Sequence, residues 1–250
     1  MGAKLQGHMV LVLHKAYAKA SYFLRTGYWQ TRERVNPDFP DDNFQNHFKV
    51  YRFISQWAPG GDVLDVGCGT GYGTAYLAET ANSVTGIDVS RAAIRLATKR
   101  YPAHLFRVMD AHQLGFPNES FDLIVSTENF EHLSDQARHL RELRRVIRPD
   151  GLGFIATPNP EMFVGIRNPY HTKENSFVEL TALFSPIFRE YLIVENSLKP
   201  ATDEGVRQQT QRWEHGKKGI RAEHLHSVFG RTVDRKFLSN THSFFCFVRP

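Results

Sequence analysis

The sequence predicts an α/β fold built on a mostly parallel sheet with helices on both faces. Within residues 61–160, short β-type runs alternate with longer stretches of helical apolar spacing. The β-type runs are apolar throughout, as expected for strands that are buried on both faces. The chain has 250 residues, a length that suits one such domain with additions.

The elements within residues 61–160 follow one another in strand–helix order. The predicted strands are Asp62–Val66, Ser83–Ile87, His104–Val108, Phe121–Ser126 and Gly151–Ala156. The predicted helices are Tyr72–Thr80, Arg91–Tyr101 and Ser134–Ile147. This alternation predicts a parallel sheet in which the helices form the outer layers.

The flanking regions are less regular. The predicted flanking elements are helices at Ala16–Leu24, Phe44–Trp57 and Phe177–Phe184 and β runs at Tyr191–Val194 and His242–Val248. The domain boundaries that we expect are an appended leader at 1–9, a helical and lid segment at 10–57, and a main domain at 58–250 with an insertion at about 199–241.

Composition excludes several classes of protein. Two cysteines provide neither a disulfide scaffold nor a zinc cluster. No run of about 18 apolar residues predicts a membrane-spanning helix, and Met9–Leu13 lacks the cleavage site of a signal peptide, so we expect a cytoplasmic protein. The net charge of +5 allows phosphorylated or nucleic-acid partners without establishing either.

The most informative segment is a glycine loop after the first strand. It reads Asp65-x-Gly67-x-Gly69-x-Gly71. A dinucleotide loop of the form G-x-G-x-x-G does not fit, and no Gly-Lys-Ser/Thr of a P-loop is present. An acid before the first glycine is unfavourable beside a pyrophosphate. It suits a ligand that carries an ammonium or sulfonium group.

Two more acids end the next two predicted strands. Asp88 follows the second strand, where a carboxylate can accept hydrogen bonds from both hydroxyls of a ribose. Asp110 follows the third strand and can accept from the exocyclic amine of a purine. Either acid alone is equally well explained as a helix cap. Together with the Asp65 loop, they predict a ligand site at the carboxyl edge of the sheet.

These motifs as a set resemble those of class I S-adenosylmethionine-dependent methyltransferases. The matching segments are Asp65–Gly71, Gly86–Asp88, Met109–Ala111, Phe121–Ile124 and Leu143–Gly151. The resemblance implies a Rossmann-like, seven-stranded sheet whose last two strands form an antiparallel edge hairpin, and S-adenosylmethionine as cofactor. It implies that the cofactor is bound by Asp65, Gly67, Cys68, Gly69, Gly71, Asp88, Val89, Asp110, Ala111 and Thr127.

The flanks resemble a narrower group, the bacterial methyltransferases that act on polysaccharide or natural-product precursors. The residues that carry this resemblance are Glu33-Arg34-x-x-Pro37, His47, Arg52, Thr157–Asn159 and Asn168–His171. In that group the N-terminal segment tends to fold over the cofactor site. We therefore expect residues from about 28 to 47 to form a lid.

Candidate catalytic residues follow the fourth strand. If residues 126–132 are helical, Glu128, Glu131 and His132 lie on one face. We expect His132, assisted by Glu131, to help remove the proton of a hydroxyl acceptor. We expect His171 to approach from the segment after strand five.

The same cluster has a second interpretation, as a metal site. Two carboxylates and an imidazole can bind a divalent cation such as Mg²⁺, which would acidify the acceptor hydroxyl. The cluster resembles the metal site of ubiquinone-biosynthesis O-methyltransferases and small-RNA 2′-O-methyltransferases. That resemblance implies Glu128, Glu131, His132 and His171 as ligands. A metal-free base at His132 explains the motif as well.

The first functional hypothesis is O-methylation of a sugar or another small hydroxylated intermediate. RNA 2′-O-methylation is the alternative, favoured by the basic tail at Lys199–Pro250. N-methylation of a small molecule stays open, because an amine needs less help with its proton. A non-catalytic cofactor-binding protein is disfavoured by the intact loop and acids. The arginine-rich stretch Arg138–Arg148 is interpreted as a solvated helix face.

Overall fold

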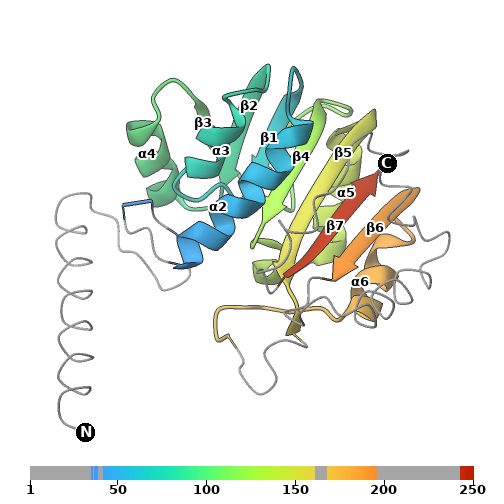
Figure 1. The fold of residues 1–250 in the computed structure, drawn as a ribbon. Coiled ribbons are helices and arrows are strands. Elements are labelled where there is room, and N and C mark those ends of the chain that lie inside the picture. The colour runs from blue at the N-terminus through green and yellow to red at the C-terminus, as the bar shows by residue number, and fades with distance from the viewer. Residues whose placement is uncertain (1–34, 36, 39–41, 161–167, 196–242) are drawn as a thin grey trace, which may run out of the picture.

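The computed structural model describes residues 35, 37–38, 42–160, 168–195 and 243–250. Within this part, a seven-stranded sheet has the order β3-β2-β1-β4-β5-β7-β6 (Figure 1). The strands are β1 Asp62–Val66, β2 Ser83–Asp88, β3 Leu105–Val108, β4 Phe121–Thr127, β5 Ile147–Pro158, β6 Glu190–Glu195 and β7 Ser243–Arg249. The strands from β3 to β5 pair in parallel, whereas β7 runs antiparallel to both β5 and β6. The predicted sheet and its antiparallel edge are confirmed.

The helices lie close to their predicted positions. They are α2 Asp42–Ile54, α3 Tyr72–Leu77, α4 Arg91–Arg100, α5 Gln136–Val146 and α6 Phe177–Phe184, with short 3-10 turns η1 Ser55–Trp57 and η2 Phe130–His132. The predicted helix at Ala16–Leu24 lies outside the described residues. Helix α6 has its predicted bounds because Ser176 and Glu179 form a capping box at its start.

The main difference in boundaries is at β5. The predicted strand Gly151–Ala156 is wrong at its start, because β5 begins at Ile147 directly after α5. Ile147 pairs with Phe121, and the register then shifts before Leu123 pairs with Leu152. This irregularity lets the strand include the polar residues Asp150 and Gly151, which local pattern alone assigns to a loop.

Each face of the sheet is covered by its own pair of helices. Helices α2 and α3 pack on one face, and α5 and α6 on the other; Figure 1 shows α2 in front of the sheet and α5 behind it. Side chains of β1 alternate between these layers: Val63 packs with α2, whereas Leu64 and Val66 pack with α5. The same alternation points Asp65 toward α2.

Strands β6 and β7, at one end of the sheet, contribute side chains to the hydrophobic clusters on both faces. Phe245 and Phe247 of β7 pack around Phe53 of α2, with ring centroids 6.2 Å away. Residues 196–242 join these two strands, so the predicted insertion at about 199–241 lies outside the described residues. Among the described helices, none has the length and apolar character needed to cross a membrane.

Candidate active site

A cavity of about 630 Å³ opens at the carboxyl ends of β1, β2 and β4, a size typical of small-molecule sites. Eight of the predicted cofactor residues line it, namely Gly67, Cys68, Gly69, Asp88, Val89, Asp110, Ala111 and Thr127. Two other predicted cofactor contacts, Asp65 and Gly71, are not among the described residues that line this cavity.

The glycine loop shapes the cavity wall. Gly69 has a φ of 55°, and a Cβ built there would meet nothing within 4 Å. Gly71 has a φ of 83°, and a Cβ there would lie 2.7 Å from the ring of Phe106. Gly69 therefore leaves room for a ligand to approach the backbone, whereas Gly71 is required for packing.

Asp88 is fixed at the tip of β2. Its carboxylate accepts hydrogen bonds from the backbone N–H of Gly69 at 3.0 Å and of Ser90 at 2.7 Å. Ser90, and not Asp88, is the N-cap of α4, because its hydroxyl accepts from Ala93 N–H. The capping explanation therefore does not account for Asp88. Its carboxylate joins the glycine loop to the cavity wall.

Asp110 is held by the residue two positions later. Asp110 Oδ1 accepts from the backbone N–H of His112 at 2.8 Å and lies 2.7 Å from His112 Nδ1. His112 Nε2 accepts from Asp135 N–H, so Nδ1 carries the ring proton. The backbone N–H of His112 is the main cause that lowers the pKa of Asp110. Asp110 thus presents a negative charge at the cavity.

Asp65 lies one layer behind the cavity, fully buried. Its Oδ1 accepts from Tyr51 Oη at 3.0 Å and its Oδ2 from Thr74 Oγ1 at 2.6 Å. Burial raises the pKa of Asp65 to about 6, although both hydrogen bonds oppose the rise. We predicted that Asp65 contacts the cofactor directly. In the structure Tyr51 of α2 lines the cavity and Asp65 does not.

The segment after β4 is not the predicted helix. Glu128 has a φ of 48°, and helical structure is confined to the short turn η2. Long-range contacts hold Glu128 in place: its N–H donates to Ala156 O at 2.8 Å, and Ser243 Oγ donates to its Oε1 at 2.7 Å. The expectation of one shared helix face is therefore wrong.

Three of the four predicted ligands nevertheless come together. Glu131, His132 and His171 place one ligand atom each within 4.8 Å of one another. Glu131 is 1% exposed and accepts from Thr157 Oγ1 at 3.1 Å. Burial, with a smaller contribution from nearby Glu128, raises the pKa of Glu131 well above its ordinary value. Burial and the neighbouring carboxylate thus disfavour the charged form of Glu131.

The two histidines have defined tautomers. A carbonyl oxygen can only accept, so His132 Nδ1 donates to Tyr170 O at 3.1 Å, and Nε2 carries the lone pair 3.7 Å from Glu131 Oε1. His171 Nδ1 donates to Glu174 Oε1 at 2.5 Å, and its Nε2 accepts from the Asn168 amide at 2.9 Å. His132 lines the cavity, whereas Glu131 and His171 lie behind it.

The predicted lid falls partly outside the described residues. Residues 28–34, 36 and 39–41 belong to that undescribed part. Val35 and His47, which are described, line the cavity. Thr70 Oγ1 of the glycine loop also donates to Val35 O at 3.4 Å. The N-terminal segment thus reaches the cavity at these two residues.

Comparisons with known proteins identify the family. A model of the methyltransferase domain matches residues 64–155. The chain is 34% identical over 216 residues to a "Probable S-adenosylmethionine-dependent methyltransferase" of Mycolicibacterium smegmatis, with 84% of this chain and 82% of the relative covered. The chain belongs to the class I S-adenosylmethionine-dependent methyltransferases. A similarly described protein of Mycobacterium tuberculosis is 39% identical to this methyltransferase over 161 residues, 61% of this chain and 58% of that protein.

Solved structures show the same fold. An S-adenosylmethionine-dependent methyltransferase from Mesorhizobium loti matches with a TM-score of 0.56 at 16% identity, covering 82% of this chain and 98% of that one. The [4+2]-cyclase SpnF matches with a TM-score of 0.56 at 20% identity, covering 88% and 84%. These likenesses concern the fold alone. The family assignment of this methyltransferase rests on the sequence relatives.

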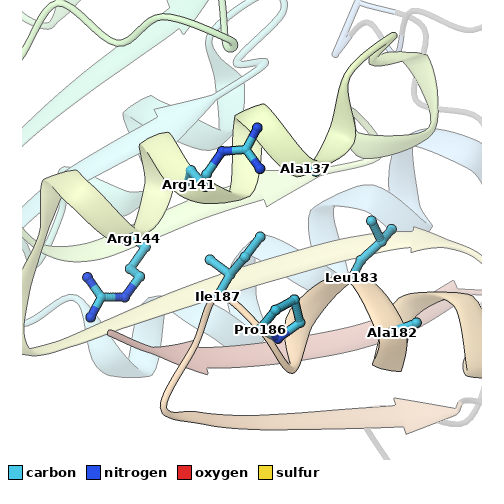
Figure 2. Close-up of a pocket in the computed structure, with 7 residues that line it drawn as sticks. All are labelled: Ala137, Arg141, Arg144, Ala182, Leu183, Pro186 and Ile187. Carbon is cyan, nitrogen blue, oxygen red and sulfur yellow. The ribbon is translucent and has the colours of Figure 1, made fainter.

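A second hollow lies between α5 and the end of α6. Figure 2 shows Arg141 and Arg144 projecting from α5. The apolar side chains in the last turn of α6 and just after it lie below them in this view. Its lining is Ala137, Arg141, Arg144, Ala182, Leu183, Pro186 and Ile187. None of these residues lines the cofactor cavity. The arginine-rich face of α5 is thus separate from the site of methyl transfer.

Sequence patterns missed several residues of the cavity wall. Those without a motif to mark them include Tyr51, Tyr72 and Asn129. A signal for Tyr51 exists at Gly73, where a Cβ would lie 2.1 Å from the Tyr51 ring. A glycine inside a short helix, with no turn to require it, indicates the close approach of another side chain.

Proposed function

We propose that this methyltransferase transfers a methyl group to a hydroxyl oxygen of a sugar or another small biosynthetic intermediate, with His132 as the base. The observation that carries the proposal is the tautomer of His132. With its Nδ1 proton engaged by Tyr170 O, the basic Nε2 belongs to a side chain that lines the cofactor cavity. A base so placed meets a hydroxyl that enters beside the cofactor.

The chemistry needs such a base. Bound S-adenosylmethionine supplies an electrophilic methyl group on a sulfonium. A hydroxyl is a weak nucleophile, so proton removal by a positioned base is worth roughly 10²–10⁴-fold in rate. His132 accepts the proton on Nε2. The resulting imidazolium faces Glu131 Oε1 at 3.7 Å, and this carboxyl oxygen stabilises its positive charge.

The residues behind His132 hold it in position. The His171 ring packs edge-to-face against the His132 ring, with centroids 5.0 Å apart. His171 is in turn fixed by Glu174 and Asn168. This gives His171 the role of a positioning residue, while Glu131 stabilises the protonated base.

Relatives support the reaction type but leave the acceptor open. An O-methyltransferase of Pyrenophora dematioidea is 35% identical over 134 residues, 51% of this chain and 50% of that protein. A relative from Synechocystis is named for a phytyl hydroquinone and is 36% identical over 134 residues, 50% of this chain and 42% of that protein. Because these matches cover about half of each protein, the acceptor class rests on the site and on the flanking motifs.

A divalent cation is the alternative form of the same proposal. The donor atoms of Glu131, His132 and His171 lie within 4.8 Å of one another, close to the spacing that metal bonds of about 2.0–2.2 Å require. Such a cation would polarise the acceptor hydroxyl. Glu131 would have to bind in its charged form, and His171 would have to lose its contact with Asn168, with Glu174 remaining as the partner of its Nδ1.

RNA methylation has less support. Residues 199–242, most of the basic tail, lie outside the described residues. Among the described residues of α5, Arg145 binds Glu142, and none of its arginines lines the cofactor cavity. Arg148, which follows α5, binds Asp62. N-methylation would leave His132 without a necessary role.

The test is His132→Ala assayed with a panel of hydroxylated sugars and phenols, with S-adenosylhomocysteine production as the readout. Turnover should fall by roughly 10²–10⁴-fold, while cofactor affinity stays within about twofold of wild type. His104→Ala, which is remote from the cavity lining, is the matched control. Wild-type turnover in His132→Ala would show that neither base nor cation acts there.

Chelation separates the two forms of the proposal. Full activity after exhaustive EDTA treatment supports the metal-free base. Loss of activity that Mg²⁺ or another divalent cation restores supports ligation by Glu131, His132 and His171. In that case Glu128→Gln should retain cation dependence, because Glu128 accepts a hydrogen bond from Ser243 and is not one of the three grouped ligands.

A further inference from the structure

The hydroxyl of Tyr51 lies between the cofactor cavity and the buried carboxylate of Asp65. It donates to Asp65 Oδ1 at 3.0 Å and accepts from Thr127 Oγ1 at 3.2 Å. Tyr51 is 3% exposed and lines the cavity. A phenol has one hydrogen and two lone pairs, and an ionised carboxylate can only accept. These two bonds use the hydrogen and one lone pair of Tyr51 Oη, and the second lone pair can accept a further hydrogen bond.

The ring of Tyr51 is fixed by close packing. A Cβ at Gly73 would lie 2.1 Å from its Cζ, so the ring rests directly on the backbone of α3. The ring of Tyr72 packs against it edge-to-face, with centroids 5.6 Å apart. The hydroxyl is thus held in one position before any ligand binds, and a ligand contact there costs little ordering.

We infer that Tyr51 contacts the ammonium group of S-adenosylmethionine through this lone pair, and that Asp65 acts on the cofactor through Tyr51. An ammonium has N–H groups to donate, whereas a sulfonium has none. Asp65 does not line the cavity, and both its oxygens already accept hydrogen bonds. The inference rests on cofactor binding by the family and is independent of the acceptor and of the role of His132.

The charge of Asp65 strengthens the contact. A hydroxyl that donates to an ionised carboxylate becomes a better acceptor for a cation. Burial raises the pKa of Asp65 to about 6, the hydrogen bonds of Thr74 and Tyr51 lower it, and the charge of Asp88 raises it further. The other titratable groups that face Asp65 are Cys68 and Tyr72, whose own pKa values burial raises. Asp65 is therefore largely ionised at pH 7, and loss of the Tyr51 hydroxyl raises its pKa.

The test is calorimetric binding to Tyr51→Phe, which keeps the ring and removes the hydroxyl. Affinity for S-adenosylmethionine at pH 7.5 should fall about 10-fold, as expected for a hydrogen bond to a charged group. S-adenosylhomocysteine keeps the ammonium and lacks the sulfonium, so its affinity should fall equally. The control is Tyr76→Phe, whose ring packs on Phe48 at 5.0 Å outside the cavity lining.

The dependence of affinity on pH separates this role from mere packing. Wild-type affinity should decrease as the pH falls through about 6, because Asp65 takes up a proton. In Tyr51→Phe the midpoint should move to higher pH. Asp65→Asn should remove this step, and Tyr51→Phe added to it should weaken binding by less than about twofold, because residues that act as a unit are not additive.

Four results would overturn the inference. The first is a Tyr51→Phe variant whose cofactor affinity and pH midpoint equal those of wild type, and the second is a full additivity of the Tyr51→Phe and Asp65→Asn effects on affinity. The third is a loss of affinity for S-adenosylmethionine but not for S-adenosylhomocysteine, and the fourth is an equal loss of affinity in Tyr76→Phe. None of these bears on turnover, which His132→Ala tests separately. Conversely, a normal His132→Ala enzyme leaves the binding role of Tyr51 intact.

Discussion

Two buried carboxylates stand at the same edge of the sheet, Asp65 on the cofactor side and Glu131 on the acceptor side. Each accepts a hydrogen bond from a threonine, Asp65 from Thr74 at 2.6 Å and Glu131 from Thr157 at 3.1 Å. Asp65 also accepts from Tyr51, and Glu131 also has a backbone hydrogen bond, but Glu131 has two acidic neighbours, Glu128 and Glu174, that oppose its charge. Their pKa values diverge accordingly: that of Asp65 rises to about 6, and that of Glu131 rises well above its ordinary value.

The difference teaches that neighbours, and not burial alone, decide which carboxylate carries charge. Burial opposes ionisation of both groups. Two side-chain donors partly offset burial at Asp65, whose pKa rises only to about 6, so Asp65 is largely ionised at neutral pH. At Glu131 burial and the charge of Glu128 act in the same direction and disfavour the charged form.

The largest expected effect is a loss of cofactor affinity on the cofactor side of the site, with no such loss on the side of Glu131. Asp88→Ala removes a carboxylate that lines the cavity and orders the glycine loop. Cofactor affinity should fall by about 5- to 150-fold, or about 1–3 kcal/mol. Glu131→Gln mimics the protonated acid and should leave affinity within about twofold of wild type. Calorimetry on both variants checks this, and weakening by Glu131→Gln that equals that of Asp88→Ala would break the comparison.

A matched pair of threonine variants compares the two donors. Thr74→Val removes a hydrogen bond to an ionised group and should reduce the free energy of unfolding by about 1.5–3 kcal/mol at pH 7. Thr157→Val removes a longer bond, to a carboxyl whose charged form burial disfavours, and should cost about 0.5–1.5 kcal/mol. Urea denaturation measures both. Equal losses, or a larger loss in Thr157→Val, would mean that the two carboxyls carry the same charge.

His139 tests whether desolvation sets charge elsewhere in the fold. Its side chain is fully buried, and burial lowers its pKa to about 4. The unfolded chain takes up a proton below about 6.5 and the folded chain does not, so stability is lost as the pH falls from 6.5 toward 4. Between pH 7 and pH 5 this should remove about 1–2 kcal/mol, a dependence that His139→Leu abolishes. The same slope in the variant would assign it to other groups.

The fold was largely predictable because its signals are local. Apolar runs and helical spacing predicted the strands and helices between Asp62 and Pro158, and α6 was predicted at its observed bounds. The start of β5 at Ile147 was missed, since it depends on pairing with Phe121 across the sheet. Boundaries fixed by a partner strand are not visible in a local pattern.

The site was predictable where backbone motifs define it. The glycine loop, Asp88 and Asp110 lie at strand ends, so order along the chain places them. The helix expected at Glu128 was wrong because Ala156 and Ser243 hold that residue from other strands. Tyr51 was missed for a similar reason: its partners Asp65 and Gly73 are close in space and distant in sequence.

The most direct test of the contrast between the two carboxyls is a ¹³C NMR titration of the side-chain carboxyl groups of the full chain. Asp65→Asn and Glu131→Gln assign the two signals. Asp65 should titrate near pH 6 and be ionised at neutral pH. Glu131 should titrate well above the ordinary range of a glutamate, since burial raises its pKa. Two carboxyls that both ionise below pH 5 would contradict the account.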